Sequence, residues 1–538
     1  MTKPIRGSGN FPDHIMISIY DNPATTMAIT WRCDVKITDG FVLYREDGTE
    51  RQERIESTHH TFKSDIDESN IFGVRLKNLK PGTKYFYTCG NQDYRSKEYS
   101  FCTAPEKIDK FKFICFSDQQ KGDPFEKPDY SGFNKFVKDV LRENPDTAFI
   151  LTGGDNTDCG QHEQQWNGAL LGFEGIMESV PLQMSVGNHD NRGFEDYRLG
   201  IGRYYAEPAE YFNTQFKYAY ADNGPGIWKT ENYTFDYGNA HFSVIGINGP
   251  EEVNDWLVSD LSANKQDWKL GVYHFPVCYS GVDCQNYDCI PAISEGMEKL
   301  DLLFSGHEHN FSRSFPRHGE ELFEKPSMGT VHYMLGNSNQ NPPGSKTMSK
   351  VWHAAYYAQE ARNRCVCIVE IEDRKMTLTS LLDDGRIVDK CVIDKDKDEI
   401  TPYAIAPFFG ENRTKMFFKG MDLGLAAADI HPFNENGVWY LPIGLLISFI
   451  GGEVVREKGK IRLSVYDHTA EFTENSRTVI ADTGEITLDY PCIRGSCGQL
   501  YVPADAVSVF EMRWAYSERN NFISVEHESE DHPYCIQN

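Results

Sequence analysis

The sequence predicts a multidomain protein: a β-sandwich, then an α/β domain whose sheets are flanked by helices, then a small α+β repeat domain. Three observations support this order. Residues 11–104 alternate apolar and polar side chains with a period of two, residues 105–398 alternate strand and helix patterns, and residues 415–538 contain an internal repeat. A chain of 538 residues is also too long for one hydrophobic core.

The first of these regions reads as a series of short strands. The runs "HIMISIY", "TTMAITWRC" and "GTKYFYTCG" alternate in period two, and turn signals such as Asn22-Pro23 and Pro81-Gly82 separate such runs. No helical pattern interrupts them. Short strands at this spacing indicate a β-sandwich of immunoglobulin-like size.

The central region changes to a succession of strand, helix and strand. The runs "KFKFICFSD", "TAFILTGGD" and "PLQMSVGNHD" are predicted strands, and segments with helical spacing of apolar residues separate them. This βαβαβ order predicts right-handed crossovers. Ligands of such sheets gather beyond the carboxyl ends of the strands, and all three runs end in side chains that can bind metal.

The last region repeats itself. The stretch "WYLPIGLLISFIGGEV" matches "LYVPADAVSVFEMRWA", which aligns Tyr440 with Tyr501 and Pro442 with Pro503. Each copy predicts a helix after the proline and a β-rich run after the helix.

Charge and hydropathy limit the function classes. With 54 Lys and Arg against 80 Asp and Glu, the formal net charge is -26, which repels nucleic acid and anionic lipid and argues against a nucleic-acid scaffold role. No stretch approaches membrane-spanning length, and the first residues lack the apolar segment of an export signal. The chain as written is therefore expected to be cytoplasmic, although a processed secreted or cell-surface form would have the same sequence.

Five short motifs carry the candidate chemistry. Each has an ordinary structural explanation when taken singly, because a strand-end Asp is often a turn or helix cap and a lone buried His often only satisfies a hydrogen bond. Their occurrence in one order, each after an apolar run, is much more specific. They are Asp118-Gln119-Gln120, Gly154-Asp155, Gly187-Asn188-His189-Asp190, His274, and Gly306-His307-Glu308-His309.

This ordered set closely resembles the calcineurin-like metallophosphoesterase superfamily, which implies an α/β sandwich of sheets flanked by helices for residues 105–398. The stretch "LKNLKPGTKYFY" with Trp31 resembles a fibronectin type III domain. Together the two domains most resemble bacterial purple acid phosphatase-like proteins. The C-terminal repeat resembles the copper amine oxidase N-terminal-like accessory domain, without copper-site residues, and its ligand or partner is open.

The resemblance implies a centre of two metal ions bridged by Asp155. One cation would also be bound by Asp118 and His309, and the other by Asn188, His274 and His307. Mixed oxygen and nitrogen ligands suit Fe, Mn or Zn better than Mg or Ca, and a bridged pair is the arrangement that two-metal hydrolysis requires.

The same resemblance implies catalytic roles for His189 and Asp190. His189 would face the substrate together with Asn188, stabilise the phosphoryl charge and protonate the leaving oxygen, while Asp190 would tune it. The nucleophile would be a metal-bound hydroxide. Arg313 follows the last motif and is a further candidate for contact with the leaving group.

The sequence departs from the family at the first cation. The superfamily has Asp-x-His where this chain has Gln120, and purple acid phosphatases have a tyrosine three residues after the bridging Asp, where this chain has Asp158. Two alternatives follow. The Gln120 amide binds the metal or a water on it, or Gln120 binds nothing and Asp158 or solvent completes the site.

The favoured function is a two-metal phosphatase, a hydrolase acting on a small phosphorylated substrate such as a phosphomonoester. A phosphodiesterase or nucleotide hydrolase on the same site is the first alternative, because the motifs do not fix the leaving group. A non-catalytic binding protein with a degenerate first metal site is the second.

Overall fold

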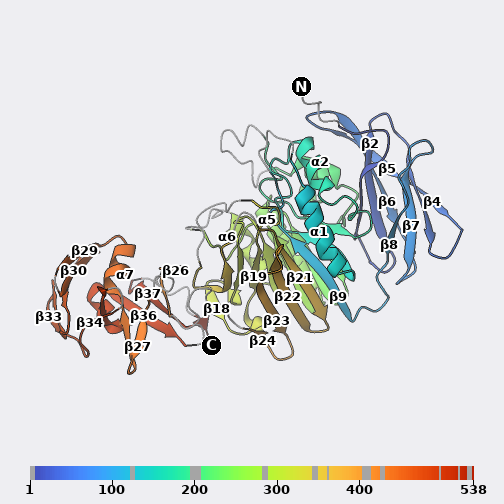
Figure 1. The fold of residues 1–538 in the computed structure, drawn as a ribbon. Coiled ribbons are helices and arrows are strands. Elements are labelled where there is room, and N and C mark those ends of the chain that lie inside the picture. The colour runs from blue at the N-terminus through green and yellow to red at the C-terminus, as the bar shows by residue number, and fades with distance from the viewer. Residues whose placement is uncertain are drawn as a thin grey trace. The chain divides into compact units, whose positions relative to one another are not determined.

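The computed structural model describes residues 7–121, 128–193, 207–281, 289–341, 349–359, 363–402, 414–424, 430–457, 459–495, 498–518, 521–529 and 536–537. The chain forms two compact units, one of Met1–Arg317, Lys325–Thr347 and Tyr357–Pro402, the other of His318–Glu324, Met348–Tyr356 and Tyr403–Asn538 (Figure 1). The predicted multidomain, sheet-rich fold is confirmed. Among the described helices none is long and apolar enough to cross a membrane.

The first unit begins with the expected β-sandwich. Trp31 stacks on Phe72 with ring centroids 5.3 Å apart, and both pack in one core with Val42 and Tyr87 of the opposite sheet. One sheet has the order β1-β2-β6-β5, from β1 (Asp13–Ser18), β2 (Met27–Asp34), β6 (Glu68–Leu76) and β5 (Thr58–Lys63). The other has the order β4-β3-β7-β8, from β4 (Glu53–Glu56), β3 (Phe41–Glu46), β7 (Lys84–Gly90) and β8 (Tyr99–Cys102).

Two further sheets of the first unit make the α/β domain. The first has the order β11-β10-β9-β21-β22-β23-β24, with β11 (Leu182–Gln183), β10 (Thr147–Thr152), β9 (Lys110–Phe116), β21 (Cys365–Glu372), β22 (Lys375–Leu382), β23 (Ile387–Asp394) and β24 (Glu399–Thr401). β9 pairs with β10 and β10 with β11 in parallel, as the βαβαβ pattern predicts. In the second, six strands of this unit follow the order β12-β13-β14-β15-β19-β16, with β12 (Tyr233–Tyr237), β13 (Ala240–Ile245), β14 (Trp268–Tyr273), β15 (Leu302–Ser305), β19 (Val331–Leu335) and β16 (Phe311–Ser314).

Aromatic side chains join these two sheets face to face. Phe113 of β9 meets Phe242 of β13 and Phe304 of β15 edge to face, with centroids 5.2 and 6.2 Å apart. Phe149 of β10 meets Phe235 of β12 in the same way at 5.4 Å. All five rings are buried, so the long apolar runs of the sequence form one core between the sheets.

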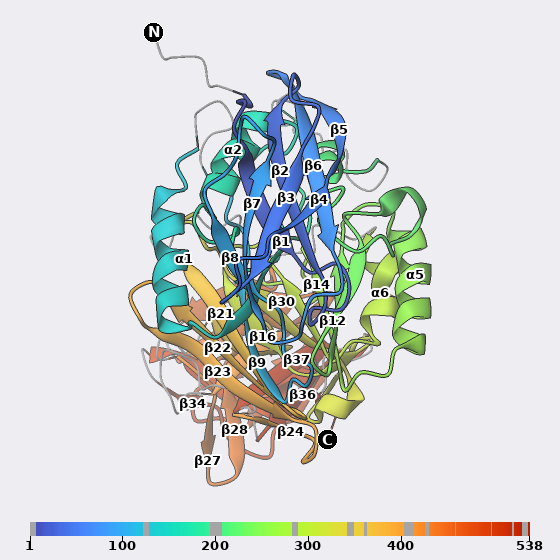
Figure 2. The same ribbon diagram turned by 90° about the vertical axis from the view of Figure 1, so that its right-hand side faces the viewer.

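Helices cover the outer faces of this pair of sheets. In Figure 2, α1 (Ser131–Glu143) lies on one side and α5 (Pro250–Ala263) and α6 (Cys289–Met297) lie on the other. The buried face of α1 carries Phe133 and Phe136, whose rings contact Phe116. The other short helical segments of the domain are α2 (Glu163–Leu171), α4 (Glu210–Gln215), η1 (Gly226–Trp228) and η2 (Pro326–Met328).

A buried histidine ties α5 to the sheet beneath it. His241 on β13 is 4 % exposed, with Nδ1 2.6 Å from Asp236 Oδ1 and Nε2 2.7 Å from Asp260 Oδ2 on α5. Burial alone would lower the pKa of His241, but these two carboxylates outweigh it and raise the pKa to about 9.

This arrangement predicts a pH dependence of stability. Because the folded-state pKa is raised, the stabilisation is fully present below the ordinary histidine pKa of about 6.5 and is lost as pH rises through about 9. We expect the free energy of unfolding to fall by up to about 3 kcal/mol across that window. Urea titrations at both pH values would measure it. The His241→Gln protein should lack this component, and an equal pH dependence in both proteins would contradict the assignment.

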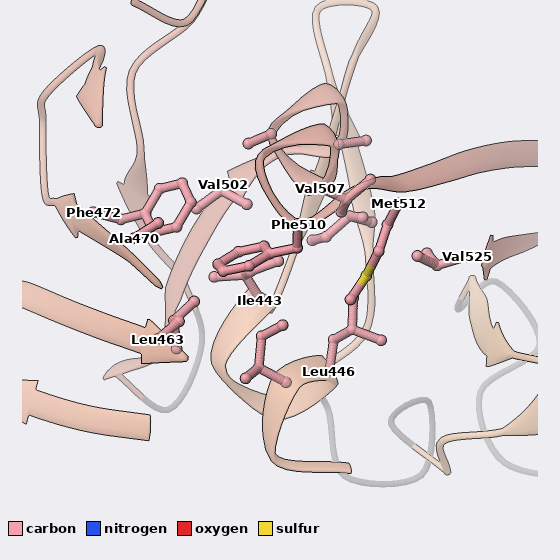
Figure 3. Packing of buried hydrophobic residues seen from close by; sticks show 14 of the residues in the cluster. Ile443, Leu446, Leu463, Ala470, Phe472, Val502, Val507, Phe510, Met512 and Val525 are labelled. Carbon is pink, nitrogen blue, oxygen red and sulfur yellow. The ribbon is translucent and has the colours of Figure 1, made fainter. Parts of the chain in front are cut away.

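The second unit contains the repeat, and its two copies differ in helix type. After Pro442 the chain forms the α-helix α7 (Ile443–Phe449), whereas after Pro503 it forms the 3-10 helix η4 (Ala504–Phe510). Ile443 and Leu446 of the first copy pack with Val507 and Phe510 of the second in one core (Figure 3). The repeat is therefore one folded body.

Short sheets surround that core. A meander β29-β30-β31-β32-β33 comprises β29 (Glu453–Glu457), β30 (Lys460–Val465), β31 (His468–Thr473), β32 (Thr478–Ala481) and β33 (Gly484–Thr487). Two four-stranded sheets comprise β26 (Met421–Asp422), β25 (Lys415–Phe418), β37 (Phe522–His527) and β36 (Met512–Ser517), and β27 (Phe433–Glu435), β28 (Val438–Leu441), β35 (Leu500–Pro503) and β34 (Ile493–Arg494).

Two segments from within residues 105–398 belong to this second unit. β18 (Glu321–Phe323) pairs in parallel with β38 (Ile536–Gln537), and Lys350 forms a β-bridge with Met421. Pairings of only one or two residues leave no periodic pattern, so the sequence does not show them.

Candidate metal centre

The motif residues lie where strands of both sheets end. Asp118 follows β9, Asp155 follows β10, and His307 and His309 follow β15. Backbone bonds join the first two loops, since Asp118 N–H donates to Gly154 O (3.1 Å) and Gln120 N–H donates to Asp155 O (2.9 Å). The Asp118 carboxylate then accepts from His307 N–H at 2.9 and 3.0 Å and from Ser117 Oγ at 2.7 Å. These bonds bring three separate motifs to one place.

The backbone at this place is strained. Four non-glycine residues adopt left-handed conformations: Asp118 (φ 52°), Asp155 (φ 51°), His307 (φ 77°) and His309 (φ 57°). Each such residue costs about 1 kcal/mol or more, and strain of this kind clusters at functional sites. The four carboxylate and imidazole side chains are thus aimed by a conformation that the rest of the fold has to maintain.

Two glycines allow the close approach of these loops. A Cβ at Gly187 would lie 2.2 Å from Asp155 Oδ1, and one at Gly306 would lie 2.0 Å from Ser117 Oγ. Ser117 and Asp155 are buried, and contacts this short would force them to shift, which explains why the motifs carry glycine at these positions.

One cluster of donor atoms forms around Asn188. Its Oδ1 lies 3.1 Å from His274 Nε2 and 3.0 Å from His307 Nδ1. His274 Nε2 also lies 3.1 Å from Asp155 Oδ2, while His274 Nδ1 donates to Gly153 O at 2.8 Å. That bond fixes the tautomer and leaves Nε2 for another partner. Among the described residues, Asp155, His274 and His307 are the group whose ligand atoms all lie within 4.8 Å of one another.

The electrostatics of this cluster suit a cation. Burial would raise the pKa of Asp155, but His274 and His189 hold it well below its usual range, so Asp155 is ionised. Burial lowers the pKa of His307 to about 3, whereas at His274 the Asp155 carboxylate outweighs burial and raises the pKa to about 9. In this cluster a proton on His274 balances the negative charge of Asp155, and a bound metal cation would take the place of that proton.

A second cluster forms around Gln120. When its Nε2 donates to Asp118 O (3.1 Å) and Asp155 O (3.0 Å), its Oε1 faces His309 Nε2 at 3.2 Å. The amide atom at that position also lies 3.3 Å from Asp155 Oδ2, and His309 Nε2 lies 3.5 Å from Asp118 Oδ1. The Gln120 side chain thus reaches Asp155 Oδ2 and His309 Nε2, and His309 in turn lies beside the Asp118 carboxylate.

Asp158 lies beside His189. Its Oδ1 is 3.0 Å from His189 Nδ1, and Arg192 Nη2 lies 3.4 Å from the same oxygen and 2.6 Å from His189 Nδ1. The His189 backbone N–H donates to Asp155 Oδ1 at 2.8 Å, and its Nε2 is 3.8 Å from Asp155 Oδ2. The His189 side chain is 20 % exposed, so it is the partly open member of the site.

The sequence predicts that Asp190 tunes His189, whereas in the structure the Asp190 carboxylate is held by the two neighbouring loops. Its buried carboxylate accepts from Gly187 N–H (2.9 Å), Thr157 N–H (2.9 Å) and Asn156 Nδ2 (2.8 Å), and burial raises its pKa to about 6. Within the described residues it is Asp158, not Asp190, whose carboxylate lies within hydrogen-bonding distance of the His189 ring. Asp190 joins the loop after β10 to the loop after β11.

Arg313 lies on β16 with a fully buried side chain, and its Nε donates to buried Asp389 at 2.7 Å. This buried position leaves no exposed side-chain surface for a substrate. The sequence-based prediction that Arg313 contacts the leaving group is therefore not supported by its place in the fold.

Two contributors escaped sequence reasoning. Arg192 follows the Gly187–Asp190 motif by two residues, and Asn341 donates from Nδ2 to Asp118 O (3.0 Å) and Gln120 O (2.7 Å). The amide-rich run "NSNQN", which begins two residues after the end of β19, is the signal in the sequence for the second.

Family models match three parts of the chain. Residues 12–103 match the purple acid phosphatase N-terminal domain, residues 111–311 match the calcineurin-like phosphoesterase, and residues 422–525 match the copper amine oxidase N-terminal domain.

Individual proteins give the same picture. The chain is 26% identical over 308 residues to "Probable inactive purple acid phosphatase 1" of Arabidopsis thaliana, covering 50% of this chain and 49% of the relative. It is 24% identical over 337 residues to purple acid phosphatase 15 of the same plant (53% and 55%) and over 383 residues to acid phosphatase type 7 of Mus musculus (61% and 78%). The chain thus spans about half the length of the two plant relatives.

The fold also matches a solved structure, the purple acid phosphatase PPD1 from yellow lupin seeds, with a TM-score of 0.59 and 18% identity over 72% of this chain and 75% of that one. The resemblance read from the motifs is confirmed: residues 111–311 match the calcineurin-like phosphoesterase model between matches to the purple acid phosphatase N-terminal domain and the copper amine oxidase N-terminal domain, and the chain shares its fold with a purple acid phosphatase.

Proposed function

We propose that the protein is a two-metal phosphoesterase that hydrolyses a small phosphomonoester. The observation that carries this proposal is the pair of donor clusters that share Asp155, one with Asn188, His274 and His307, the other with Asp118, Gln120 and His309. The partly exposed His189 lies beside the shared carboxylate.

The donor set fits a pair of cations. In each cluster, side-chain oxygen and nitrogen atoms lie 3.0–3.5 Å from one another, although they come from loops that are far apart in sequence. Carboxylate, amide and imidazole donors together suit Fe, Mn or Zn. When bound, such a pair supplies an acidified water as nucleophile and neutralises charge on the phosphoryl oxygens.

The remaining steps belong to residues of this chain. The bond from His189 N–H to the Asp155 carboxylate places His189, and Asp158 holds its Nδ1, so Nε2 is the nitrogen that presents a proton to the leaving oxygen. Arg192 lies against both side chains and keeps Asp158 in place. Asp190 fixes the loop that carries Asn188 and His189, without contacting substrate.

An assay with two substrates tests the proposal. The protein, supplied in turn with Mn, Fe and Zn, should hydrolyse an aryl phosphate faster than a bis-aryl phosphate, with the bound metal measured in the same samples. Preference for the bis-aryl ester would make the protein a phosphodiesterase. Binding of metal without hydrolysis of either ester would support a non-catalytic binding role and refute the enzyme proposal.

Gln120 gives a separate prediction about metal retention. The neutral amide oxygen of Gln120 faces His309 Nε2. We therefore expect Gln120→Ala to lower the affinity for one of the two cations roughly tenfold, and Gln120→His to raise that affinity. Metal content after dialysis against a weak chelator would measure both. Gln119, whose amide bonds Asn156 instead, provides the control, and Gln119→Ala should retain both cations. Equal retention in all four proteins would remove Gln120 from the ligands.

A further inference from the structure

The β-sandwich completes a helix of the α/β domain. Helix α2 begins at Glu163, and its N-cap residue His162 makes no side-chain capping bond. Asp65, in the loop between β5 and β6, supplies the missing acceptor. Its Oδ1 accepts from Glu163 N–H at 2.9 Å, and its Oδ2 lies 3.0 Å from His162 Nδ1. The first N–H groups of a helix need such partners, and here the partner comes from another domain.

A buried ion pair secures the same contact. The Glu163 side chain is fully buried, accepts a hydrogen bond from Ser64 Oγ and pairs with Arg32 of β2. Arg32 is 3 % exposed and is held in turn by Asp13, at 2.8 and 2.7 Å. Together with the Asp65 contact, these bonds hold the sandwich against the first turn of α2.

The first turns of α2 lead directly to the candidate site. Gln165 Oε1 accepts from Asp158 N–H at 3.3 Å, and Trp166 Nε1 donates to Gly160 O at 2.8 Å. Gly160 N–H donates to His189 O at 2.8 Å. The segment from Asp158 to Gly160 therefore lies between α2 and the loop that carries His189.

These contacts form one connected path. Asp65 fixes the start of α2, α2 fixes the backbone of Asp158, and Asp158 Oδ1 lies 3.0 Å from His189 Nδ1. We propose that the β-sandwich acts through Asp65 as a positioning element for His189, so that proton donation to the leaving group depends on a domain that does not touch the substrate. The inference rests on the proposed phosphoesterase function and names Asp65 as a positioning residue, not a catalytic one.

Leaving-group dependence distinguishes positioning from mere domain packing. An alkyl phosphate needs its leaving oxygen protonated, whereas an activated aryl phosphate needs this much less. We expect Asp65→Ala to lower kcat for the alkyl phosphate roughly tenfold more than kcat for the aryl phosphate, with KM little changed. Asp65→Asn keeps an oxygen acceptor for Glu163 N–H and should restore most of the alkyl activity.

Hydrogen exchange gives a readout that needs no activity. The Glu163 amide should exchange faster in Asp65→Ala than in the wild type and Asp65→Asn proteins, because its acceptor is lost. Tyr87→Phe is the matched control. Tyr87 Oη donates to Glu178 O at 2.8 Å, so this change also removes one bond between the same two domains, but beyond the C-terminal end of α2. It should leave the alkyl-to-aryl ratio within about twofold of wild type.

Each result decides between the proposals. If Asp65→Ala leaves the ratio of alkyl to aryl kcat unchanged, whether or not both values fall, the positioning role is overturned while the phosphoesterase proposal stands. A wild-type protein that hydrolyses neither ester with metal supplied would refute the phosphoesterase and this inference with it.

Discussion

Replacing Asp155 by asparagine is expected to lower kcat/KM for a phosphomonoester by about 10³-fold or more, which corresponds to about 4 kcal/mol of transition-state stabilisation. Asp155 is the carboxylate common to both donor clusters, with Oδ2 3.1 Å from His274 Nε2 and 3.3 Å from the Gln120 amide. It also holds His189 through its Oδ1. The loss of its charge therefore affects both cations and the proton donor together.

The measurement is kcat/KM beside metal content for the wild type and Asp155→Asn. Both quantities should fall in the variant. Asp146→Asn serves as the matched control, because Asp146 is an exposed carboxylate paired with Lys112 at the other end of β10. It should retain both metal and activity. An Asp155→Asn protein with full activity would show that Asp155 does not bridge the cations.

Replacing His189 by alanine should reduce kcat by roughly 10²- to 10⁴-fold for an alkyl phosphate and by much less for an activated aryl phosphate. The physical reason is that the His189 ring, held by Asp158 at 3.0 Å, is the partly exposed proton donor of the site. The residue contributes no side-chain atom to the two donor clusters, so the variant should keep its metal.

The ratio of the two kcat values, with metal content measured in parallel, tests this role. His59→Gln changes an exposed histidine of β5 and should leave the ratio unchanged. A uniform loss on both esters in His189→Ala would assign His189 to binding instead of proton transfer, and loss of metal would place it among the ligands.

Much of the site was accessible to sequence reasoning, because the strands impose it. Asp118 and Asp155 each follow an apolar run, and neighbouring parallel strands present their carboxyl ends at one edge of a sheet. Once the runs are read as strands, the ends must meet. The same logic places His274 after β14 and His307 after β15.

Other features depend on side-chain directions that no pattern encodes. The spacing from Asp155 makes Asp158 a candidate ligand, yet its carboxylate lies against His189 and Arg192. Its direction follows from the left-handed backbone at Asp155 and the bond from Asp158 N–H to Gln165. The Asp65 contact with Glu163 joins residues that lie 98 positions apart and belong to different domains. The Arg313 side chain points into the core because it pairs there with the buried carboxylate of Asp389.

The sequence by itself determined the order of the domains, the strands of the α/β domain and the motif residues at the strand ends, because periodicity and chain order are local properties of a strand. Only the tertiary structure decided which carboxylate holds His189, where the Gln120 amide points and what caps α2. Those choices depend on hydrogen bonds between loops that are distant in the chain, and such bonds form only when the whole unit has folded.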